Sequence, residues 1–188
     1  MTLLKISWVS KLQPDLILGG SILGLTPDII QQYQLSGLVL DVDQTLIPVT
    51  KSRVSREIER WVEQTRAMVS LWLVSNNLSE HRISRIASSL DLPYIYGARK
   101  PSRRKLKIAV DAMNLPIDQV AMVGDRLFTD VLAGNRLGMF TILVEPIRDQ
   151  AMSKSLYPMR DLEVWFSQAL GVSLTTMQQN FNKPDKSK

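Results

Sequence analysis

Three apolar runs of the chain each end in polar side chains, and this pattern constrains the fold more than any other feature. The runs cover residues 37–40, 70–74 and 120–123. Short apolar runs of this kind are typical of buried strands. Segments with apolar residues at helical spacing lie between them. Strands that alternate with helices predict a parallel sheet covered on both faces, which binds ligands at the carboxyl ends of its strands.

The helical segments are recognised by the spacing of their apolar side chains. Residues 53–66 carry Ile58, Trp61 and Val62 on one face, and we assign Trp61 to the core. Further helices are expected over 26–33, from 79 to 90, after the cap Ser102, from 129 or 130, and over 161–170, and further strands over 94–97 and 140–144. The predicted fold class is α/β, a Rossmann-like three-layer sandwich with a central, mostly parallel sheet.

Two carboxylates, Asp41 and Asp43, follow the first apolar run. Positions two apart in an extended strand share a face, so both side chains point the same way. Two carboxylates at ~4 Å repel by about 4 kcal/mol at an effective dielectric near 20, which calls for a cation, a proton or separation. Mg²⁺ is the natural cation for such oxygen ligands. For this pair alone a simple turn is an equally good explanation, because Asp is common in turns.

The second and third apolar runs also end in polar residues, and this repetition favours a ligand site over a simple turn. A Gly turn and two acids, Asp125 and Asp130, follow the third run and lead into a helix. The other polar residues at these ends are Ser75, Asn76 and Asn77 after the second run, and Arg99 and Lys100 ahead of the basic helix. All of them fall at or just after the carboxyl end of an expected strand, where ligands of parallel sheets bind.

Taken in order, these motifs resemble the haloacid dehalogenase superfamily of phosphohydrolases. Its four motifs are a DxDxT strand end, a Ser or Thr strand end, a Lys, and a GDxxxTD-type acidic pair. The segments Asp43-Gln44-Thr45-Leu46, Ser75-Asn76-Asn77, Ala98-Arg99-Lys100-Pro101 and the stretch 124–131 look like the YqeG-type subgroup of subfamily IIIA. That subgroup includes phosphatidylglycerophosphate phosphatases.

The resemblance implies a role for each acid. Asp41 would be the nucleophile that forms an aspartyl-phosphate, and Asp43 the general acid for the leaving alcohol and later the base for water. Mg²⁺ would be held by Asp41, by the main-chain carbonyl of Asp43 and by Asp125. Asp130 would support the ion from further out or through water.

The resemblance also implies how phosphate would be bound. Ser75 and backbone N–H groups near Asn76 would hold phosphoryl oxygens, and Lys100 would neutralise charge in the transition state, with Lys105 as its competitor. The residues expected to contact substrate are Thr45, Asn76, Asn77, Arg99 and Arg103. Two other motifs are set aside: His81 has no second His or Cys nearby for a transition metal, and Gly19-Gly20-Ser21 lacks the Lys of a phosphate loop.

Composition indicates an acidic partner. The chain of 188 residues has 23 Lys plus Arg against 18 Asp plus Glu, a net charge of +5 and no cysteine, with a pI near 9.6. Such a balance favours phosphates, anionic lipid or nucleic acid, and basic residues cluster over 99–107 beside the expected site. No aromatic residue is interleaved with this cluster, which argues against RNA stacking.

The spacing of the motifs leaves no room for a cap domain, because one helix fills 46–69 and a helix and a short strand fill 77–100. An uncapped site suits a phosphate that protrudes from a membrane, a protein or a nucleic-acid end. The resemblance implies dephosphorylation of phosphatidylglycerophosphate to phosphatidylglycerol. The alternatives are a nucleic-acid end, a phosphoprotein or a small phosphate ester as substrate, transfer to an acceptor other than water, and a basic RNA- or ribosome-binding module.

The expected organisation has three parts. Residues 1–35 form an N-terminal segment packed on the core or lying at a membrane surface, 36–172 the phosphatase domain, and 173–188 a flexible polar tail. No run of ~20 apolar residues is present, so no spanning helix is expected. We expect a cytoplasmic protein, with peripheral membrane contact as the alternative.

Overall fold

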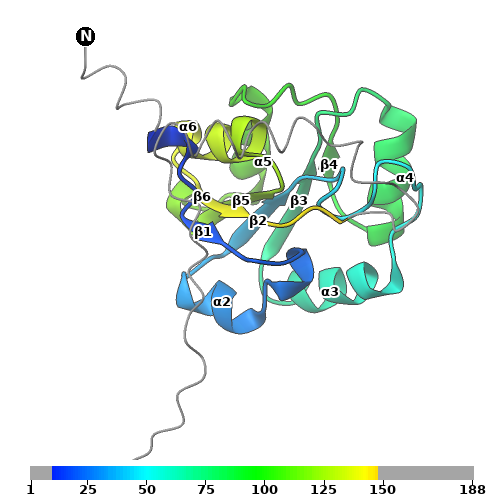
Figure 1. Cartoon of the computed structure of the whole chain (residues 1–188), viewed down its shortest axis with the longest axis horizontal. Coiled ribbons are helices and arrows are strands. Elements are labelled where there is room, and N and C mark those ends of the chain that lie inside the picture. The colour runs from blue at the N-terminus through cyan, green and yellow to red at the C-terminus, as the bar shows by residue number, and fades with distance from the viewer. Residues whose placement is uncertain (1–9, 148–188) are drawn as a thin grey trace, which may run out of the picture.

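The computed structural model describes residues 10–147, and these form a single six-stranded sheet with helices on both faces (Figure 1). The strand order is β1-β6-β5-β2-β3-β4, and every neighbouring pair is parallel. The strands are β1 Leu16–Ile17, β2 Gly37–Leu40, β3 Ser70–Val74, β4 Tyr94–Ile95, β5 Val120–Gly124 and β6 Phe140–Leu143. The predicted α/β class and parallel sheet are confirmed.

The helices match the expected segments closely. They are α2 Pro27–Gln32, α3 Arg56–Arg66, α4 Glu80–Leu90, α5 Arg104–Met113 and α6 Leu132–Leu137, with short helical turns at Ser10–Leu12, Ile22–Gly24, Ile117–Gln119 and Leu127–Val131. The helix expected over 161–170 lies outside the described residues. None of the helices described between residues 10 and 147 has the length and apolar character needed to span a membrane.

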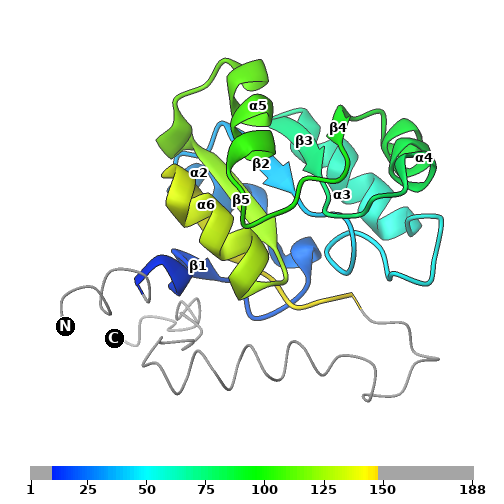
Figure 2. The ribbon, with the colours of Figure 1, turned by 90° about the horizontal axis from the view of Figure 1, so that it is seen from above.

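Side chains of each central strand alternate between two apolar layers. In β2, Leu38 and Leu40 join the layer under α3 and α4, whereas Val39 joins the layer under α5 and α6. In Figure 1, α5 and α6 lie above the sheet and α2 and α3 below it, and Figure 2 shows the same arrangement from above. A strand buried on both faces must be apolar at every position, which accounts for the continuous apolar runs.

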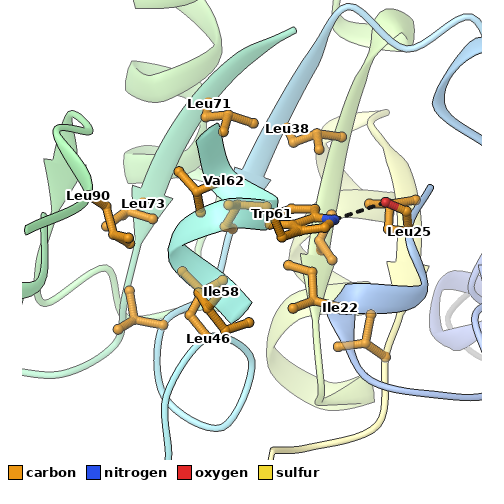
Figure 3. Close-up of a cluster of buried hydrophobic side chains, with 14 of the residues drawn as sticks. Ile22, Leu25, Leu38, Leu46, Ile58, Trp61, Val62, Leu71, Leu73 and Leu90 are labelled. Carbon is orange, nitrogen blue, oxygen red and sulfur yellow. Dashed lines mark hydrogen bonds between the residues drawn. The ribbon is translucent and has the colours of Figure 1, made fainter. Parts of the chain in front are cut away.

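Trp61 connects α3 to the N-terminal segment. The residue is 7% exposed and packs in the core as predicted, and its Nε1 donates a hydrogen bond to the carbonyl of Leu25 at 2.9 Å (Figure 3). The helix starts where expected because the Ser55 hydroxyl accepts from the N–H of Ile58. Since the indole N–H has a buried partner, the tryptophan both fills the layer and orients the segment that precedes β2.

The N-terminal segment supplies an edge strand that sequence analysis did not predict. Strand β1 pairs with β6, and Leu16 and Ile22 are buried. The Asp15 carboxylate accepts hydrogen bonds from the N–H and hydroxyl of Thr141, which fixes this pairing. A two-residue strand has no measurable alternation, so its sequence carried no signal.

Two helix starts also differ from expectation. The helix expected from 129 or 130 is preceded by a π-helical turn over Leu127–Val131. Helix α5 begins at Arg104 after an uncapped Arg103, and the Ser102 hydroxyl accepts from the N–H of Arg104 at 3.5 Å. Ser102 is therefore not the N-cap residue, although its hydroxyl contacts the first turn.

The strand order places a topological switch point beside β2. From β2 the chain continues to β3 and β4 on one side, and it returns to β5 on the other. The connection that leaves β2 and the connection that leaves β5 therefore run in opposite directions. This leaves a space at the carboxyl ends of the two strands. The residues that follow β2 and β5 are Asp41 and Asp125, so both expected acid motifs meet at this point.

Candidate active site

Asp41 lies directly after β2, and its position is fixed by the sheet. Its backbone N–H donates to the carbonyl of Val123 at 2.9 Å, so the ladder to β5 continues through it. The chain then turns sharply at Gln44, where φ is 68° and the N–H donates to the carbonyl of Ile47. Asp41 is 6% exposed, whereas the side chain of Asp43 is 18% exposed. The turn therefore directs one acid into the site and the other to its rim.

Asp125 and Asp130 follow β5, and Gly124 makes their arrangement possible. The Oδ2 atom of Asp130 accepts from the N–H of Arg126 at 3.2 Å, which folds the carboxylate back over the end of the strand. A Cβ atom at Gly124 would lie 2.6 Å from the Cβ of Asp130 and closer still to its carboxyl group. Only glycine fits here, so the glycine of this motif serves a close approach between strand and acid.

Three buried carboxylates and one buried ammonium form the centre of the site. Oxygens of Asp41, Asp125 and Asp130 lie within 4.8 Å of one another. Lys100 Nζ lies 2.7 Å from Asp41 Oδ1 and from Asp130 Oδ1, and it donates to the Val74 carbonyl at 2.9 Å. These contacts join residues at or after the carboxyl ends of four different strands, as expected for a site at this edge of a parallel sheet.

Burial and charge shift the ionisation of these groups. Burial raises the pKa of Asp41 to about 6, and the Lys100 ammonium acts in the opposite direction. Burial would lower the pKa of Lys100, but the charges of Asp130 and Asp41 outweigh it and raise that pKa. Lys100 is therefore a permanent cation among the acids, and the charge of Asp41 depends on pH near neutrality.

The acidic cluster can hold Mg²⁺. Carboxylate oxygens are the ligands that this ion prefers. Arg126 Nε lies 4.0 Å from Asp125 Oδ2 but its side chain is 44% exposed, so among the described residues Lys100 is the only buried cation facing the three acids. A divalent cation would balance the remaining charge. The side chain of Asp43 lies outside this cluster, so its predicted contribution remains its main-chain carbonyl.

The polar residues after β3 hold other site residues. Asn76 accepts from the N–H of Lys100 at 2.7 Å and donates to its carbonyl at 3.0 Å, so its amide fixes the Lys100 backbone. The Ser75 hydroxyl is buried and accepts from the N–H of Asn77 at 3.1 Å. Asn77 Nδ2 donates to Asp43 Oδ2 at 3.0 Å. Both amides are thus engaged with catalytic candidates, and their predicted contact with substrate stays a prediction.

The remaining candidates are more dispersed. Lys105 Nζ donates to the Tyr96 carbonyl at 2.6 Å and lies over the Tyr96 ring, away from the acids that Lys100 contacts. Arg99 is exposed, and Arg103 donates to the carbonyl of Arg136 on α6. Thr45 is fully buried, and its hydroxyl has no hydrogen-bond partner among residues 10–147. Geometry therefore favours Lys100 over Lys105.

Sequence analysis missed Arg82. This residue lies in the first turn of α4 and forms an ion pair with Asp43 through Nη1. A cation is unfavourable near the positive end of a helix dipole, where acids are the usual choice. An arginine in the first turn that follows a site strand was therefore the signal that could have identified it.

Comparison with known proteins agrees with this geometry. A family model described as HAD-hydrolase-like matches residues 97–146. A curated Bacillus subtilis (strain 168) protein named "Probable phosphatase YqeG" is 34% identical over 128 residues, which cover 68% of this chain and 74% of that protein. The chain belongs to the YqeG-type phosphatases of the haloacid dehalogenase superfamily.

Two solved structures are similar to this chain at low sequence identity. A crystal structure of an uncharacterized protein from Listeria monocytogenes serotype 4b is 15% identical with a TM-score of 0.50, covering 73% of this chain and 99% of that one. The 3-deoxy-D-manno-octulosonate 8-phosphate phosphatase from Moraxella catarrhalis, solved with magnesium and phosphate ions, is 13% identical with a TM-score of 0.45 and coverages of 77% and 93%. Between residues 10 and 147 this YqeG-type chain has no separate cap domain.

Proposed function

We propose that this phosphatase removes the terminal phosphate of phosphatidylglycerophosphate and so acts in phospholipid biosynthesis. The hydrolysis of phosphomonoesters follows from its family, and the lipid substrate is the further step. The observation that carries it is an uncapped site with two exposed apolar side chains, Val49 and Leu78, in the loops that surround Asp43.

Asp41 attacks the phosphorus atom of the substrate. Its carboxylate oxygen forms a bond to phosphorus while the ester P–O bond breaks, and Asp43 gives a proton to the departing alkoxide. Water then attacks the aspartyl-phosphate, Asp43 takes a proton from that water, and the P–O bond to Asp41 breaks to release phosphate. The partly exposed position of Asp43 at the rim supports this role, since the leaving alcohol departs to solvent.

Lys100 and the residues after β3 support the transferring group. Lys100 lies 2.7 Å from Asp41 Oδ1, so its charge is close to any phosphoryl oxygen brought to that nucleophile. Asn76 fixes the Lys100 backbone, and the Thr45 hydroxyl, which has no partner within residues 10–147, is a donor for a phosphoryl oxygen. When bound by Asp41, Asp125 and Asp130, Mg²⁺ supplies electrostatic stabilisation of the phosphoryl oxygens.

Exposed apolar residues beside the site support a lipid surface. Leu78 is 75% exposed and follows Asn77, whose amide holds Asp43. Val49 is 47% exposed, and its carbonyl lies 3.5 Å from the Arg82 side chain that holds the other Asp43 oxygen. Both residues therefore lie near the rim where the leaving alcohol departs. Large exposed apolar side chains beside a polar site are typical of contact with a membrane or protein surface.

The charge of the same end of the molecule favours an anionic surface. The exposed basic residues in the loops after β2, β4 and β5 are Lys51, Arg53, Arg99, Arg103 and Arg126. Glu80 and Glu145 are exposed acids at this end. The excess of cations would attract anionic headgroups and raise their local concentration. A lipid with two phosphate groups fits this surface better than a neutral one.

The test compares a lipid with soluble phosphates. Phosphate release is measured with Mg²⁺ from phosphatidylglycerophosphate in mixed micelles and from glycerol phosphate, for the native chain, Val49→Ser/Leu78→Ser and the control Ile108→Ser, since Ile108 is exposed on α5. We expect kcat/KM for the lipid to fall about 10-fold in the double variant, with glycerol phosphate hydrolysis unchanged. Equal hydrolysis of lipid and glycerol phosphate, or preference for a phosphorylated nucleic-acid end or phosphopeptide, would refute the lipid substrate.

A further inference from the structure

Arg82 spans the gap between α4 and the loop after β2. Its side chain is 18% exposed. Nη1 donates to Asp43 Oδ1, and Nη2 donates to the carbonyl of Lys51 at 3.1 Å, with the carbonyls of Pro48 and Val49 at 3.5 Å. One guanidinium group thus joins a catalytic candidate to three backbone positions of a single loop. This is the forked, planar geometry that arginine provides and lysine does not.

The second oxygen of the same carboxylate is also held. Asn77 Nδ2 donates to Asp43 Oδ2 at 3.0 Å, and Asn77 Oδ1 accepts from the N–H of Ser79 at the N-cap of α4. Because each Asp43 oxygen has a different donor, rotation of the carboxyl group about its terminal bond would break both contacts. Arg82 adds the attraction of an ion pair to its hydrogen bond, whereas the Asn77 amide is neutral, so Arg82 supplies the larger part of the restraint.

We propose that Arg82 is a positioning residue for phosphoryl transfer, which holds the Asp43 carboxyl group at the leaving-group side and couples it to the 48–51 loop. This inference rests on the proposed function, in which Asp43 donates the proton to the leaving alcohol. Arg82 itself touches neither the phosphorus atom nor Asp41 in this role. Its effect passes through Asp43, because proton transfer requires donor and acceptor to be within hydrogen-bond reach.

The proposal predicts which substrates depend on Arg82. An alkoxide leaving group needs a proton as the P–O bond breaks, whereas a nitrophenolate departs readily without one. Loss of the restraint on Asp43 therefore slows cleavage of alkyl phosphates more than cleavage of activated aryl phosphates. Since kcat/KM reports steps up to the first irreversible one, it isolates this cleavage from the later hydrolysis of the aspartyl-phosphate.

The experiment measures kcat/KM with Mg²⁺ for para-nitrophenyl phosphate, phenyl phosphate and glycerol phosphate. The variants are Arg82→Gln and Arg82→Lys, and the matched control is Arg85→Gln, an exposed arginine on the same helix. We expect Arg82→Gln to lose about 10-fold or more with glycerol phosphate but less than about threefold with para-nitrophenyl phosphate. Arg82→Lys should show an intermediate difference, because its ammonium keeps the charge but not the fork.

Two results would overturn the proposal. One is an equal loss for all three esters, which indicates a merely structural role for Arg82; the other is no loss for any of them. If Arg82→Gln does not fold by circular dichroism, the same comparison with Arg82→Lys decides. A native chain inactive toward every ester would instead refute the proposed phosphatase chemistry, so the two failures are distinguishable.

Discussion

At the scale of single residues, the site depends on close approaches that particular side chains allow. Lys100 reaches Asp41 and Asp130 together, and Asn76 fixes the backbone from which it extends. Gly124 belongs to strand β5 and also shapes the site, because Asp130 packs directly against it. One added methyl group at Gly124 would therefore displace a site carboxylate rather than a side chain of the distant core.

Gly124→Ala tests this close approach. The added Cβ would displace the Asp130 carboxyl group from Lys100 and from the other two acids. A displacement near 1 Å at a catalytic site costs about 100-fold in rate, and we expect a loss of that order in Mg²⁺-dependent phosphate release. We also expect about 1–3 kcal/mol of lost stability from overpacking, measured by urea unfolding.

The matched control is Gly20→Ala. No atom of the described residues 10–147 lies within 4 Å of a Cβ built at Gly20, so activity and stability should stay at native values. A Gly124→Ala variant with native activity would show that the carboxylate of Asp130 is not required where the structure places it.

Residues that follow strands could be predicted, but the contacts that hold them could not. Asp41, Ser75 and Asp125 follow apolar runs, and the parallel sheet brings such ends together whatever the details of the loops. The contacts of Arg82 and Asn76 join positions far apart in the chain, and they depend on loop geometry that periodicity does not encode. The local sequence pattern therefore identifies the reacting groups but not the contacts that hold them in place.

At the scale of elements, the sheet is stabilised by helices that carry one apolar face each. Helix α3 shows how one element joins two others: Ile58 and Val62 pack on the sheet, while Trp61 reaches the carbonyl of Leu25 in the N-terminal segment. Long elements with strong periodicity could be predicted from sequence. The edge strand β1 and the π-helical turn before α6 could not, because each is set by contacts with its neighbours.

Trp61→Phe tests the link between α3 and the N-terminal segment. Phenylalanine fills much of the same space but leaves the Leu25 carbonyl without its buried donor, which costs about 1–3 kcal/mol. We expect the free energy of unfolding in urea to fall by about that amount. Because Trp61 lies in the core away from the acids, kcat/KM should stay within about twofold of native. A large loss of activity with unchanged stability would contradict the view that Trp61 contributes to stability alone.

At the scale of the whole molecule, three buried acids oppose folding unless cations accompany them. Burial raises the pKa of Asp41 to about 6, above its unfolded value of 3.8. Between these values the folded state retains a proton that the unfolded state has lost, so this group's contribution to stability falls as pH rises through that window. Mg²⁺ removes the cost by binding the charged form, and it therefore competes with the proton.

We expect Mg²⁺ to raise the melting temperature more at pH 8 than at pH 5. At pH 8 Asp41 is ionised and ready to bind the ion, whereas at pH 5 a proton must leave first. At 100 times the dissociation constant, the ion would add about 2.7 kcal/mol. Differential scanning fluorimetry with and without Mg²⁺ at the two pH values measures this. An equal shift at both, or a larger one at pH 5, would argue against Asp41 as a ligand.

The measurement that tests the central claim most directly is Mg²⁺-dependent phosphate release from para-nitrophenyl phosphate by the native chain and by Asp41→Asn. Asparagine keeps the size of the side chain but removes the nucleophilic carboxylate. We predict that the native chain releases phosphate with Mg²⁺ and not with a chelator, and that Asp41→Asn loses at least about 1,000-fold while still folding. Release by Asp41→Asn at the native rate, or native release without Mg²⁺, would contradict hydrolysis through Asp41 at this acidic site.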